Sequence, residues 1–203
     1  MASAAAGADG AAAAAASGPL PGGLRPVMLR CYIGLGANLG DPLRQLREAV
    51  KALAALPGSR PGPVSPLYRS TPLGPQDQPD FLNAVAALDS TLAPLALLDA
   101  LQRIEAAAGR VRGRRWGPRT LDLDLLLYGD RQLALPRLTV PHPGIAGRSF
   151  VLWPLADLCG EDFRLPSGED IGTLKRTCPG PAPVRQAQRL GPAEGGVQLD
   201  GNE

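Results

Sequence analysis

Residues 120–128, TLDLDLLLY, place the strongest constraint on the fold of this chain. Successive side chains of a β-strand point to opposite faces, so Leu121, Leu123 and Leu125 share one face while Asp122 and Asp124 share the other. The leucines predict a strand with one side in a hydrophobic core. They do not account for the two aspartates, which therefore need a separate explanation.

Two carboxylates on one strand face, about 7 Å apart at the backbone, can converge on a hard cation. Mg²⁺ is usually bound by one or two carboxylates together with phosphate oxygens, so Asp122 and Asp124 suggest a metal and polyphosphate site. The alternative is a solvated strand face on which the aspartates pair with arginines.

An arginine-rich segment comes directly before this strand and has no acidic residue in its ten positions: it contains Arg110, Arg112, Arg114, Arg115 and Arg119. Guanidinium groups match phosphate oxygens in pairs, so these cations beside a Mg²⁺ site predict binding of a nucleotide triphosphate. One alternative is a solvated basic loop. Another is RNA binding with Trp116 stacked on a base, although a net charge of +2 leaves little basic surface elsewhere.

The pattern of apolar residues predicts an α+β fold. Alternating residues indicate strands over 27–36, 81–89 and 120–128, the last followed by a turn at 129–130 and a return strand through 133–138. Helical spacing and proline or glycine at the ends predict helices over 41–56 and 93–110, and a short helix over 148–158. The seven prolines of residues 57–80 predict a loop, with at most a short strand at 64–68. The order β-α-β-β-α-β predicts a single ferredoxin-like domain, with a mainly antiparallel sheet and flanking helices on one face.

Composition predicts one folded domain between two disordered ends. Residues 1–26 are rich in alanine and glycine, and residues 176–203 have no apolar period, which leaves a domain over residues 27–175. Three widely spaced cysteines indicate reduced thiols, and no stretch approaches the roughly 20 apolar residues of a membrane span. We therefore expect a cytoplasmic protein that does not bind a membrane.

Other polar and aromatic residues have both a structural and a functional interpretation. Gly34, Gly36 and Gly40 form GxGxxxG, one residue longer than the dinucleotide-binding fingerprint, and are interpreted as a tight turn from strand to helix. Phe81 and Asn83 share a strand face and can offer an aromatic surface and an amide to a flat heterocycle, although a core Phe and an edge Asn would show the same pattern. The single histidine, His142, is a structural hydrogen-bonding residue or a donor to phosphate.

Several motifs, in this order along the chain, resemble those of the 6-hydroxymethyl-7,8-dihydropterin pyrophosphokinases of folate biosynthesis: GLGANLGD, YRSTPLGPQDQPDFLNAV, QRIE, GRVR, RWGPRTLDLDLLLYG, and LTVPHP with Arg148, Ser149 and Phe150. The resemblance covers about residues 32–168, and RWGPRTLDLD is its most specific part. It implies a ferredoxin-like fold and transfer of the diphosphate of ATP to the pterin hydroxymethyl group, with release of AMP and with two Mg²⁺ ions as cofactors.

The resemblance also implies roles for individual residues. The metal ligands are Asp122 and Asp124, and the catalytic residues are these two with Arg110 and Arg119. Residues matching the family's ATP and loop positions are Gln102, Glu105, Arg110, Arg112, Trp116, Arg119, His142 and Arg148. The pterin would be bound by Ser70, Leu73, Phe81, Asn83, Trp116 and Phe150.

The chain departs from the family pattern at three places. The loop between Arg112 and Arg115 is one residue shorter than in some members, Phe81 replaces a common tyrosine, and Thr71 replaces a frequent proline. These changes concern loop closure and pterin contacts. The loops at 68–80 and 109–119 are expected to close over ATP, since diphosphate transfer must exclude water.

Two other functions would use some of the same residues. An RNA- or nucleotide-binding module would use the arginines without chemistry, but it would not need metal-binding carboxylates. Another Mg²⁺-dependent nucleotidyl- or phosphotransferase would release a different product, since AMP indicates diphosphate transfer and ADP indicates phosphoryl transfer. For the enzyme we expect small-molecule substrates, a monomer, and no nucleic-acid partner.

Overall fold

The aspartate-bearing strand lies at one edge of an antiparallel sheet in the computed structural model, which describes residues 27–110 and 116–190. The sheet has the strand order β5-β1-β4-β3-β8, and β2 also pairs with β4. The strands are β1 (Leu29–Ala37), β2 (Ser59–Val64), β3 (Tyr68–Ser70), β4 (Phe81–Ser90), β5 (Asp122–Tyr128) and β8 (Val184–Arg185). A separate hairpin pairs β6 (Leu133–Leu135) with β7 (Leu138–Val140). The predicted return strand through 133–138 is therefore wrong: this segment is divided between β6 and β7, which pair with each other and not with β5.

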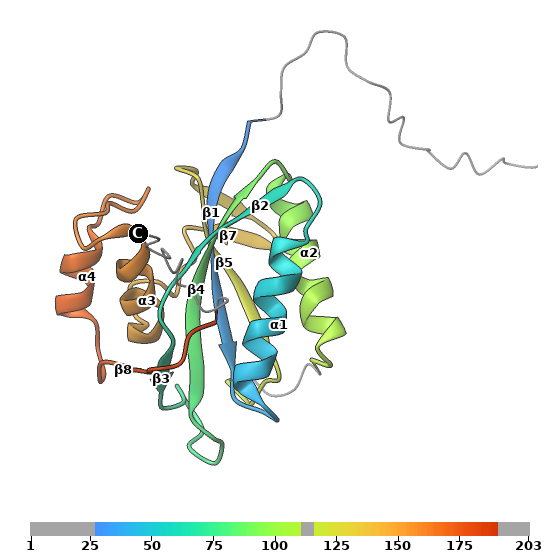
Figure 1. Ribbon diagram of the computed structural model, residues 1–203. Helices are drawn as coiled ribbons and strands as arrows, with labels where there is room; N and C mark the ends of the chain where they lie inside the picture. Colours follow the sequence, from blue (N-terminus) through green and yellow to red (C-terminus); the bar gives the residue numbers. More distant parts are fainter. Residues whose placement is uncertain (1–26, 111–115, 191–203) are drawn as a thin grey trace, which may run out of the picture.

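Helices cover both faces of the sheet, and not one face as predicted. α1 (Pro42–Ala54) and α2 (Pro94–Ala107) lie on one side, while α3 (Ser149–Cys159) and α4 (Ile171–Thr177) lie on the other (Figure 1). The central strands explain the second layer, because every residue of β4 from 83 to 88 is buried whichever way its side chain points. A strand that is apolar on both faces needs cover on both.

Local sequence signals explain where the two longest helices begin. The Asp41 carboxylate accepts a hydrogen bond from the Arg44 amide at 3.0 Å, and Pro42 occupies the first turn of α1. Pro94 has the same place in α2, and Gly109 follows the end of that helix with φ +75°. These proline and glycine positions agree with the predicted ends of both helices.

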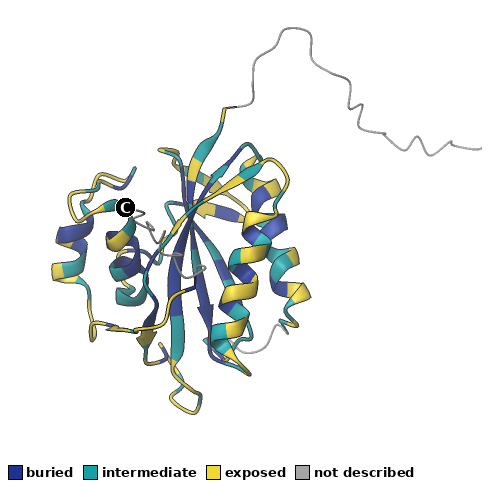
Figure 2. Ribbon diagram, viewed as in Figure 1, coloured by how far each residue is buried: buried dark blue, intermediate teal, exposed yellow. Residues whose placement is uncertain are grey.

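The sheet separates two hydrophobic clusters. One contains Leu46 of α1 and Leu101 of α2, packed with Ile33, Leu123 and other buried residues of the sheet. The second contains Leu126 and Val85 from the opposite face, packed with Leu152 and Leu155 of α3 and Ile171 of α4. Figure 2 shows the resulting distribution, with buried residues along the central strands and exposed ones on the outer faces of the helices.

The proline-rich region contains more strand than its sequence predicts. β2 includes Pro61 and Pro63, and β3 follows four residues later. Both pair with the long strand β4, at different parts of its length. Proline cannot donate to a ladder but is tolerated on an edge strand, so the prolines restrict β2 to an edge without preventing it.

The domain continues past the predicted boundary at Lys175. α4 ends at Thr177, β8 pairs with β3, and the Gln186 amide donates to the Leu67 carbonyl at 2.8 Å. Leu190 is buried in the same cluster as α1 and α2. Residues 176–190 therefore belong to the domain and not to a disordered tail. The remaining predictions of disorder, for 1–26 and 191–203, lie outside the described residues.

Within the part that the structure describes, no helix has both the length and the apolar character needed to cross a membrane. Cys31, Cys159 and Cys178 are all free thiols, as their spacing predicts.

Candidate active site

The floor of the candidate site is formed by two glycines of β1. Gly36 lies between Asn83 of β4 and Asp122 of β5, and Gly34 lies between Val85 and Asp124, in the hydrogen-bonded registers of the sheet. Because β1 has no side chain at these two positions, open space lies above it, between the side chains of β4 on one side and those of β5 on the other.

These two glycines correct one interpretation of the sequence. Both lie inside β1, not in a strand-to-helix turn; of the GxGxxxG glycines, Gly40 occupies the turn, with φ +64°. A Cβ at position 36 would meet Asn83 Oδ1 at 3.3 Å, and a Cβ at position 34 would meet the Leu126 side chain at 3.4 Å. The glycines of β1 are therefore best explained by close packing and by the space above them.

A cavity of about 270 Å³ lies over this floor. It brings together residues from β3, β4, β5, the start of α3 and the loops between them. The predicted site residues that line it are Ser70, Leu73, Phe81, Asn83, Trp116, Arg119, Asp122, Asp124, His142, Arg148 and Phe150.

One end of the cavity is charged. Asp122 forms ion pairs with Arg119 and with Arg110, the latter at 2.8 Å from Nη1 to Oδ1. Asp124 lies 3.4 Å from the Arg148 guanidinium. Burial, together with the neighbouring carboxylate of Asp122, raises the pKa of Asp124 above its ordinary range. The two carboxylates are thus close enough to repel each other and are partly neutralised by arginines.

His142 faces the same carboxylates. Its Nε2 lies 3.9 Å from Asp124 Oδ2, and its Nδ1 accepts a hydrogen bond from the Gly144 amide at 2.9 Å. Burial lowers the pKa of His142, which favours the neutral ring. Because Nδ1 is an acceptor, the neutral ring carries its hydrogen on Nε2, directed toward the charged end of the cavity.

The other end of the cavity is apolar, with one amide at its edge. Phe81, Leu73 and Phe150 line it. Asn83 is buried on β4 and donates from Nδ2 to the Ser70 hydroxyl at 2.9 Å, which fixes the orientation of its amide. Flat apolar walls beside a fixed amide suit a planar heterocycle that has hydrogen-bonding groups on its edge.

Trp116 joins the two ends. It lines the cavity, and the Arg148 guanidinium lies 5.2 Å from the centre of its ring, in cation–π geometry. Arg148 therefore contacts both an aromatic wall and the carboxylate of Asp124.

Three of the predicted residues that the structure describes lie outside the cavity lining, namely Gln102, Glu105 and Arg110. Gln102 is on α2 and accepts a hydrogen bond from Arg137 at 3.4 Å. Glu105 is buried behind β5, where its carboxylate accepts from the Leu123 amide at 2.7 Å and pairs with Arg110. Leu123 is the residue between the two aspartates, so Glu105 and Arg110 support the strand that carries them. Arg112, also predicted, lies outside the described residues.

Sequence reasoning missed several lining residues. Besides the two glycines, the walls include Thr71, Gly117 and Val151. Thr71 was noted only as a departure from the family pattern, and the others have no side-chain chemistry that marks a site. For Gly34 and Gly36, their alternation within an apolar strand was the signal that places both on one face.

The donor set fits a Mg²⁺ ion bound with substrate phosphates. Among the described residues, no group of three or more His, Cys, Asp or Glu side chains could hold a metal by itself. The cavity offers the paired carboxylates of Asp122 and Asp124, and Mg²⁺ commonly takes one or two carboxylates and completes its shell with phosphate oxygens and water. A substrate polyphosphate would therefore have to supply the remaining ligands.

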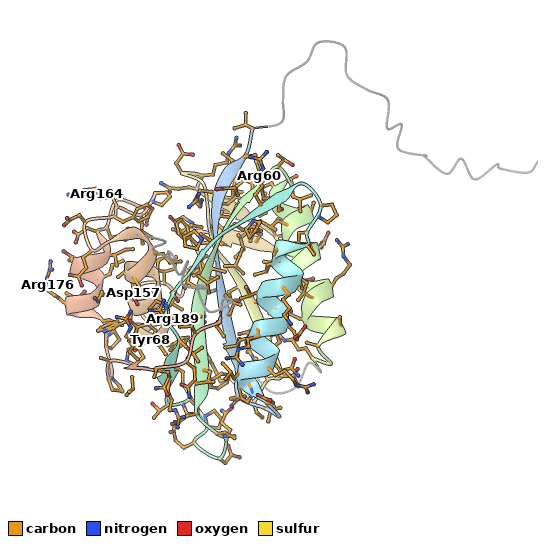
Figure 3. All side chains as sticks on the ribbon, viewed as in Figure 1. Arg60, Tyr68, Asp157, Arg164, Arg176 and Arg189 are labelled. Atoms are coloured by element: carbon orange, nitrogen blue, oxygen red, sulfur yellow. The ribbon has the colours of Figure 1, made fainter. Side chains whose placement is uncertain are left out.

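A hydrogen bond outside the cavity lining links β3 to α3. The Tyr68 hydroxyl of β3 donates to Asp157 of α3 at 2.6 Å, and both residues are labelled in Figure 3. Burial and this hydrogen bond raise the pKa of Tyr68 to about 12, so the hydroxyl keeps its proton at neutral pH. The bond connects the strand that carries Ser70 to the helix that begins beside Phe150.

Comparisons with known proteins show which family this chain is similar to. Residues 32–160 match the family model described as 7,8-dihydro-6-hydroxymethylpterin-pyrophosphokinase (HPPK). The 2-amino-4-hydroxy-6-hydroxymethyldihydropteridine pyrophosphokinase of Pseudomonas aeruginosa is 58% identical over 150 residues, which cover 74% of this chain and 92% of that protein. The protein of the same name from Haemophilus influenzae is 50% identical over 147 residues, 72% of this chain and 91% of its own length.

Solved structures show the same fold. The crystal structure of Plasmodium falciparum HPPK-DHPS wild type with pterin and p-hydroxybenzoate has a TM-score of 0.58 at 14% identity, and the match covers 75% of this chain. It covers 43% of that longer chain, so this chain spans less than half of its length. Taken with the family match and the two bacterial relatives, the likeness shows that the chain belongs to the 7,8-dihydro-6-hydroxymethylpterin-pyrophosphokinase family.

Proposed function

We propose that the cavity over Gly34 and Gly36 is the site of the family reaction, in which the diphosphate of ATP is transferred to the hydroxymethyl group of 6-hydroxymethyl-7,8-dihydropterin in folate biosynthesis. One observation carries this assignment. A single cavity combines paired carboxylates and arginines at one end with aromatic walls and a fixed amide at the other. Diphosphate transfer to a pterin needs both ends, with the reacting groups meeting between them.

The apolar end would bind the pterin. Phe81, Phe150 and Trp116 would lie near or against the faces of the ring, and Leu73 would pack beside it. The Asn83 amide, held by Ser70, would bind the hydrogen-bonding edge of the heterocycle. This arrangement would direct the hydroxymethyl group toward the charged end.

The charged end would bind the ATP phosphates. Asp122 and Asp124 would hold two Mg²⁺ ions, which when bound neutralise phosphate charge and help to align the displacement. Arg110 and Arg119, which pair with Asp122 here, would stabilise the negative charge that develops on the transferred diphosphate. Arg148 and the Nε2–H of His142 point to the same region and would donate to phosphate oxygens.

The reaction would then be an in-line displacement at the β-phosphorus of ATP. The hydroxymethyl oxygen forms a bond to the β-phosphorus, and the bond from that phosphorus to the oxygen bridging to the α-phosphate breaks. AMP leaves with the bridging oxygen, and the hydroxyl proton passes to solvent. The contribution of the chain is to hold both substrates in line and to keep cations beside the phosphates.

Further features are proposed from the sequence. Gln102, Glu105 and Arg112 match positions that the family uses around ATP or in its closing loops, and would belong to the ATP-binding region. The chain would act as a monomer in the cytoplasm and without nucleic acid. Size-exclusion chromatography with light scattering tests the monomer directly.

The decisive experiment identifies the nucleotide product. The purified protein is incubated with ATP, Mg²⁺ and 6-hydroxymethyl-7,8-dihydropterin, and nucleotides are separated by chromatography. AMP that forms only when pterin and Mg²⁺ are both present supports the proposal. ADP would indicate phosphoryl transfer, and no nucleotide product from folded protein would refute an enzymatic role for the cavity.

A matched pair of variants tests the carboxylates. Asp124→Asn removes one charge from the cavity, whereas Asp89→Asn removes one from β4 at an ion pair with Arg30, outside the cavity lining. Loss of AMP formation in the first variant with normal activity in the second is the expected result. Equal activity in both would contradict the proposed metal ligands.

A further inference from the structure

Three segments far apart in the sequence meet beside the cavity through one buried asparagine. Asn38, in the turn after β1, is 3% exposed. Its Oδ1 accepts a hydrogen bond from the Arg119 amide at 2.7 Å, and its Nδ2 donates to Gln78 Oε1 at 3.1 Å and to the Pro79 carbonyl at 2.9 Å. The Asn38 backbone amide also donates to the Arg119 carbonyl at 3.0 Å.

Gln78 extends this network to the aromatic wall of the cavity. Its Nε2 donates to the Trp116 carbonyl at 2.8 Å and to the Pro75 carbonyl at 2.9 Å, while its Oε1 accepts from Asn38. The amides of Asn38 and Gln78 thus join the loop at 71–80 to the segment at 116–119. We call these two residues the amide clasp.

The amide clasp holds Trp116 in a backbone conformation that a tryptophan rarely adopts. Trp116 has φ +62°, in the left-handed region that costs energy for any residue with a Cβ. Gly74 lies against it, and a Cβ at that glycine would come within 3.0 Å of the Trp116 Cβ. The bond from Gln78 to the Trp116 carbonyl and the close approach of Gly74 therefore fix both the backbone and the side chain of Trp116.

The same clasp fixes Arg119. Both the amide and the carbonyl of Arg119 are bonded to Asn38, and the Arg119 guanidinium pairs with Asp122. One network therefore sets the position of an aromatic wall at the pterin end and of a cation at the phosphate end.

We infer that Asn38 and Gln78 are positioning residues for the diphosphate transfer, and that they act by holding Trp116 and Arg119 at a fixed position relative to each other. This inference rests on the proposed function of the cavity. The clasp touches neither substrate, and its effect passes through these two residues. Displacing a reacting group by about 1 Å can cost about a hundredfold in rate, so loosening the clasp would lower activity strongly without removing any group that contacts substrate.

The chain supplies a matched control within the same loop. Gln76 also donates two hydrogen bonds from Nε2, to the Pro72 carbonyl at 3.0 Å and to the Gly74 carbonyl at 2.8 Å, but both partners lie within residues 71–80. Gln78→Met and Gln76→Met each remove an amide and keep a side chain of similar length and no charge. They differ in whether the lost bonds cross to the neighbouring segments.

The test has a kinetic and a spectroscopic measurement. AMP formation gives kcat and KM, and we expect kcat/KM of Gln78→Met to fall about ten- to a hundredfold, with a larger change in kcat than in KM for ATP. The chain has two tryptophans, so Trp153→Phe leaves Trp116 as the sole tryptophan, which can be excited at a wavelength that tyrosine does not absorb. In that background acrylamide should quench Trp116 more strongly after Gln78→Met than after Gln76→Met.

A second substitution tests whether the two residues act together. Asn38→Ala should lower kcat/KM as well, and the double variant with Gln78→Met should lose less than the product of the two single losses, because both remove the same network. Circular dichroism confirms that each variant is folded before it is compared.

The results separate failure of the inference from failure of the proposed function. If the parent protein forms no AMP, the proposed function is wrong, and quenching of Trp116 alone decides whether the clasp positions it. If the parent is active but folded Gln78→Met stays within about twofold of Gln76→Met in kcat/KM, the inference is overturned. Equal quenching of Trp116 in the two variants also overturns it.

Discussion

Glu105 gives the sharpest quantitative prediction, because its carboxylate is almost fully buried and its partners are defined. Its side chain is 7% exposed, and Oε1 accepts from both the Leu123 amide and the Arg110 guanidinium. Glu105→Ala would leave the buried Leu123 N–H without this partner, at a cost of about 1–3 kcal/mol. It would also remove one buried methylene group, worth about 0.8 kcal/mol.

These contributions predict a loss of about 3 kcal/mol in the free energy of unfolding for Glu105→Ala. Glu105→Gln should lose far less, about 1 kcal/mol or below, because a glutamine oxygen can accept both hydrogen bonds. Burial raises the pKa of Glu105, so its ionised form is harder to accommodate in the folded protein than in water. The contribution of Glu105 to the free energy of unfolding is therefore fully present below pH 4.5 and is lost as pH rises through the folded pKa. At pH 7 this loss reduces the advantage of the glutamate over the neutral glutamine of Glu105→Gln.

Urea unfolding followed by circular dichroism measures these differences. The control is Glu48→Ala on α1, where the carboxylate is 61% exposed and pairs with Lys51 at the surface. That change should stay within about 0.5 kcal/mol of the parent. If Glu105→Ala lost no more than Glu48→Ala, or if Glu105→Ala and Glu105→Gln lost equally, the assigned role of the buried hydrogen bonds would be wrong.

Three further predictions follow from the site and the core. Asp124→Asn should lower AMP formation by about a thousandfold, because the proposed metal ligand would be lost. The same change should raise the unfolding temperature of the metal-free protein, because the pKa of Asp124 is raised and its ionised form therefore costs stability as pH rises through the folded pKa. NMR titration of His142, the single histidine of the chain, should show a pKa below 6.5. Because the folded pKa is lowered, the stability of the protein should fall as pH drops below 6.5 toward the folded pKa. A measured pKa above 6.5 would contradict burial as the dominant cause. Leu190→Ala should cost about 2–4 kcal/mol in urea unfolding, because Leu190 is 6% exposed in the main cluster, whereas a loss near zero would mean that residues 176–190 add little to the domain.

Elements with a strong local pattern were predictable from the sequence. The alternation of Leu121, Leu123 and Leu125 with Asp122 and Asp124 predicted β5 and the separation of its faces, and the structure confirms both. The starts of α1 and α2 followed from proline at the first turn. In these cases the residues that define the element also determine which side is buried.

Elements that depend on tertiary pairing were not predictable. β3 and β8 have three and two residues, too few for a period, and they form because β3 pairs with β4 and β8 pairs with β3. β2 contains prolines that locally argue against a strand, and its position at an edge makes them harmless. The layer formed by α3 and α4 likewise depends on β4 being buried on both faces. An alternating pattern of apolar residues predicts burial of one face only, so it does not predict this second layer.

The candidate site was predictable where residue chemistry is distinctive. The aspartates, arginines and aromatics were found from their types and from the family resemblance, and most of them line one cavity. The amide clasp was missed because Asn38 and Gln78 are polar loop residues whose meaning depends on contacts about forty positions apart. Gly34 and Gly36 were misassigned to a turn because glycine is also a common turn residue, although their alternation places both on one strand face.

The glycine floor also determines how the range of substrates could be engineered. A pocket whose central strand already lacks side chains cannot be deepened by trimming that strand, so a bulkier heterocycle would have to be admitted through the walls at Phe81, Leu73 or Phe150. In the other direction, one methyl group at Gly36 would sit 3.3 Å from Asn83 Oδ1 and crowd the amide that would recognise the ring. Directed evolution of this enzyme for new acceptors should therefore leave β1 unchanged and diversify the rim.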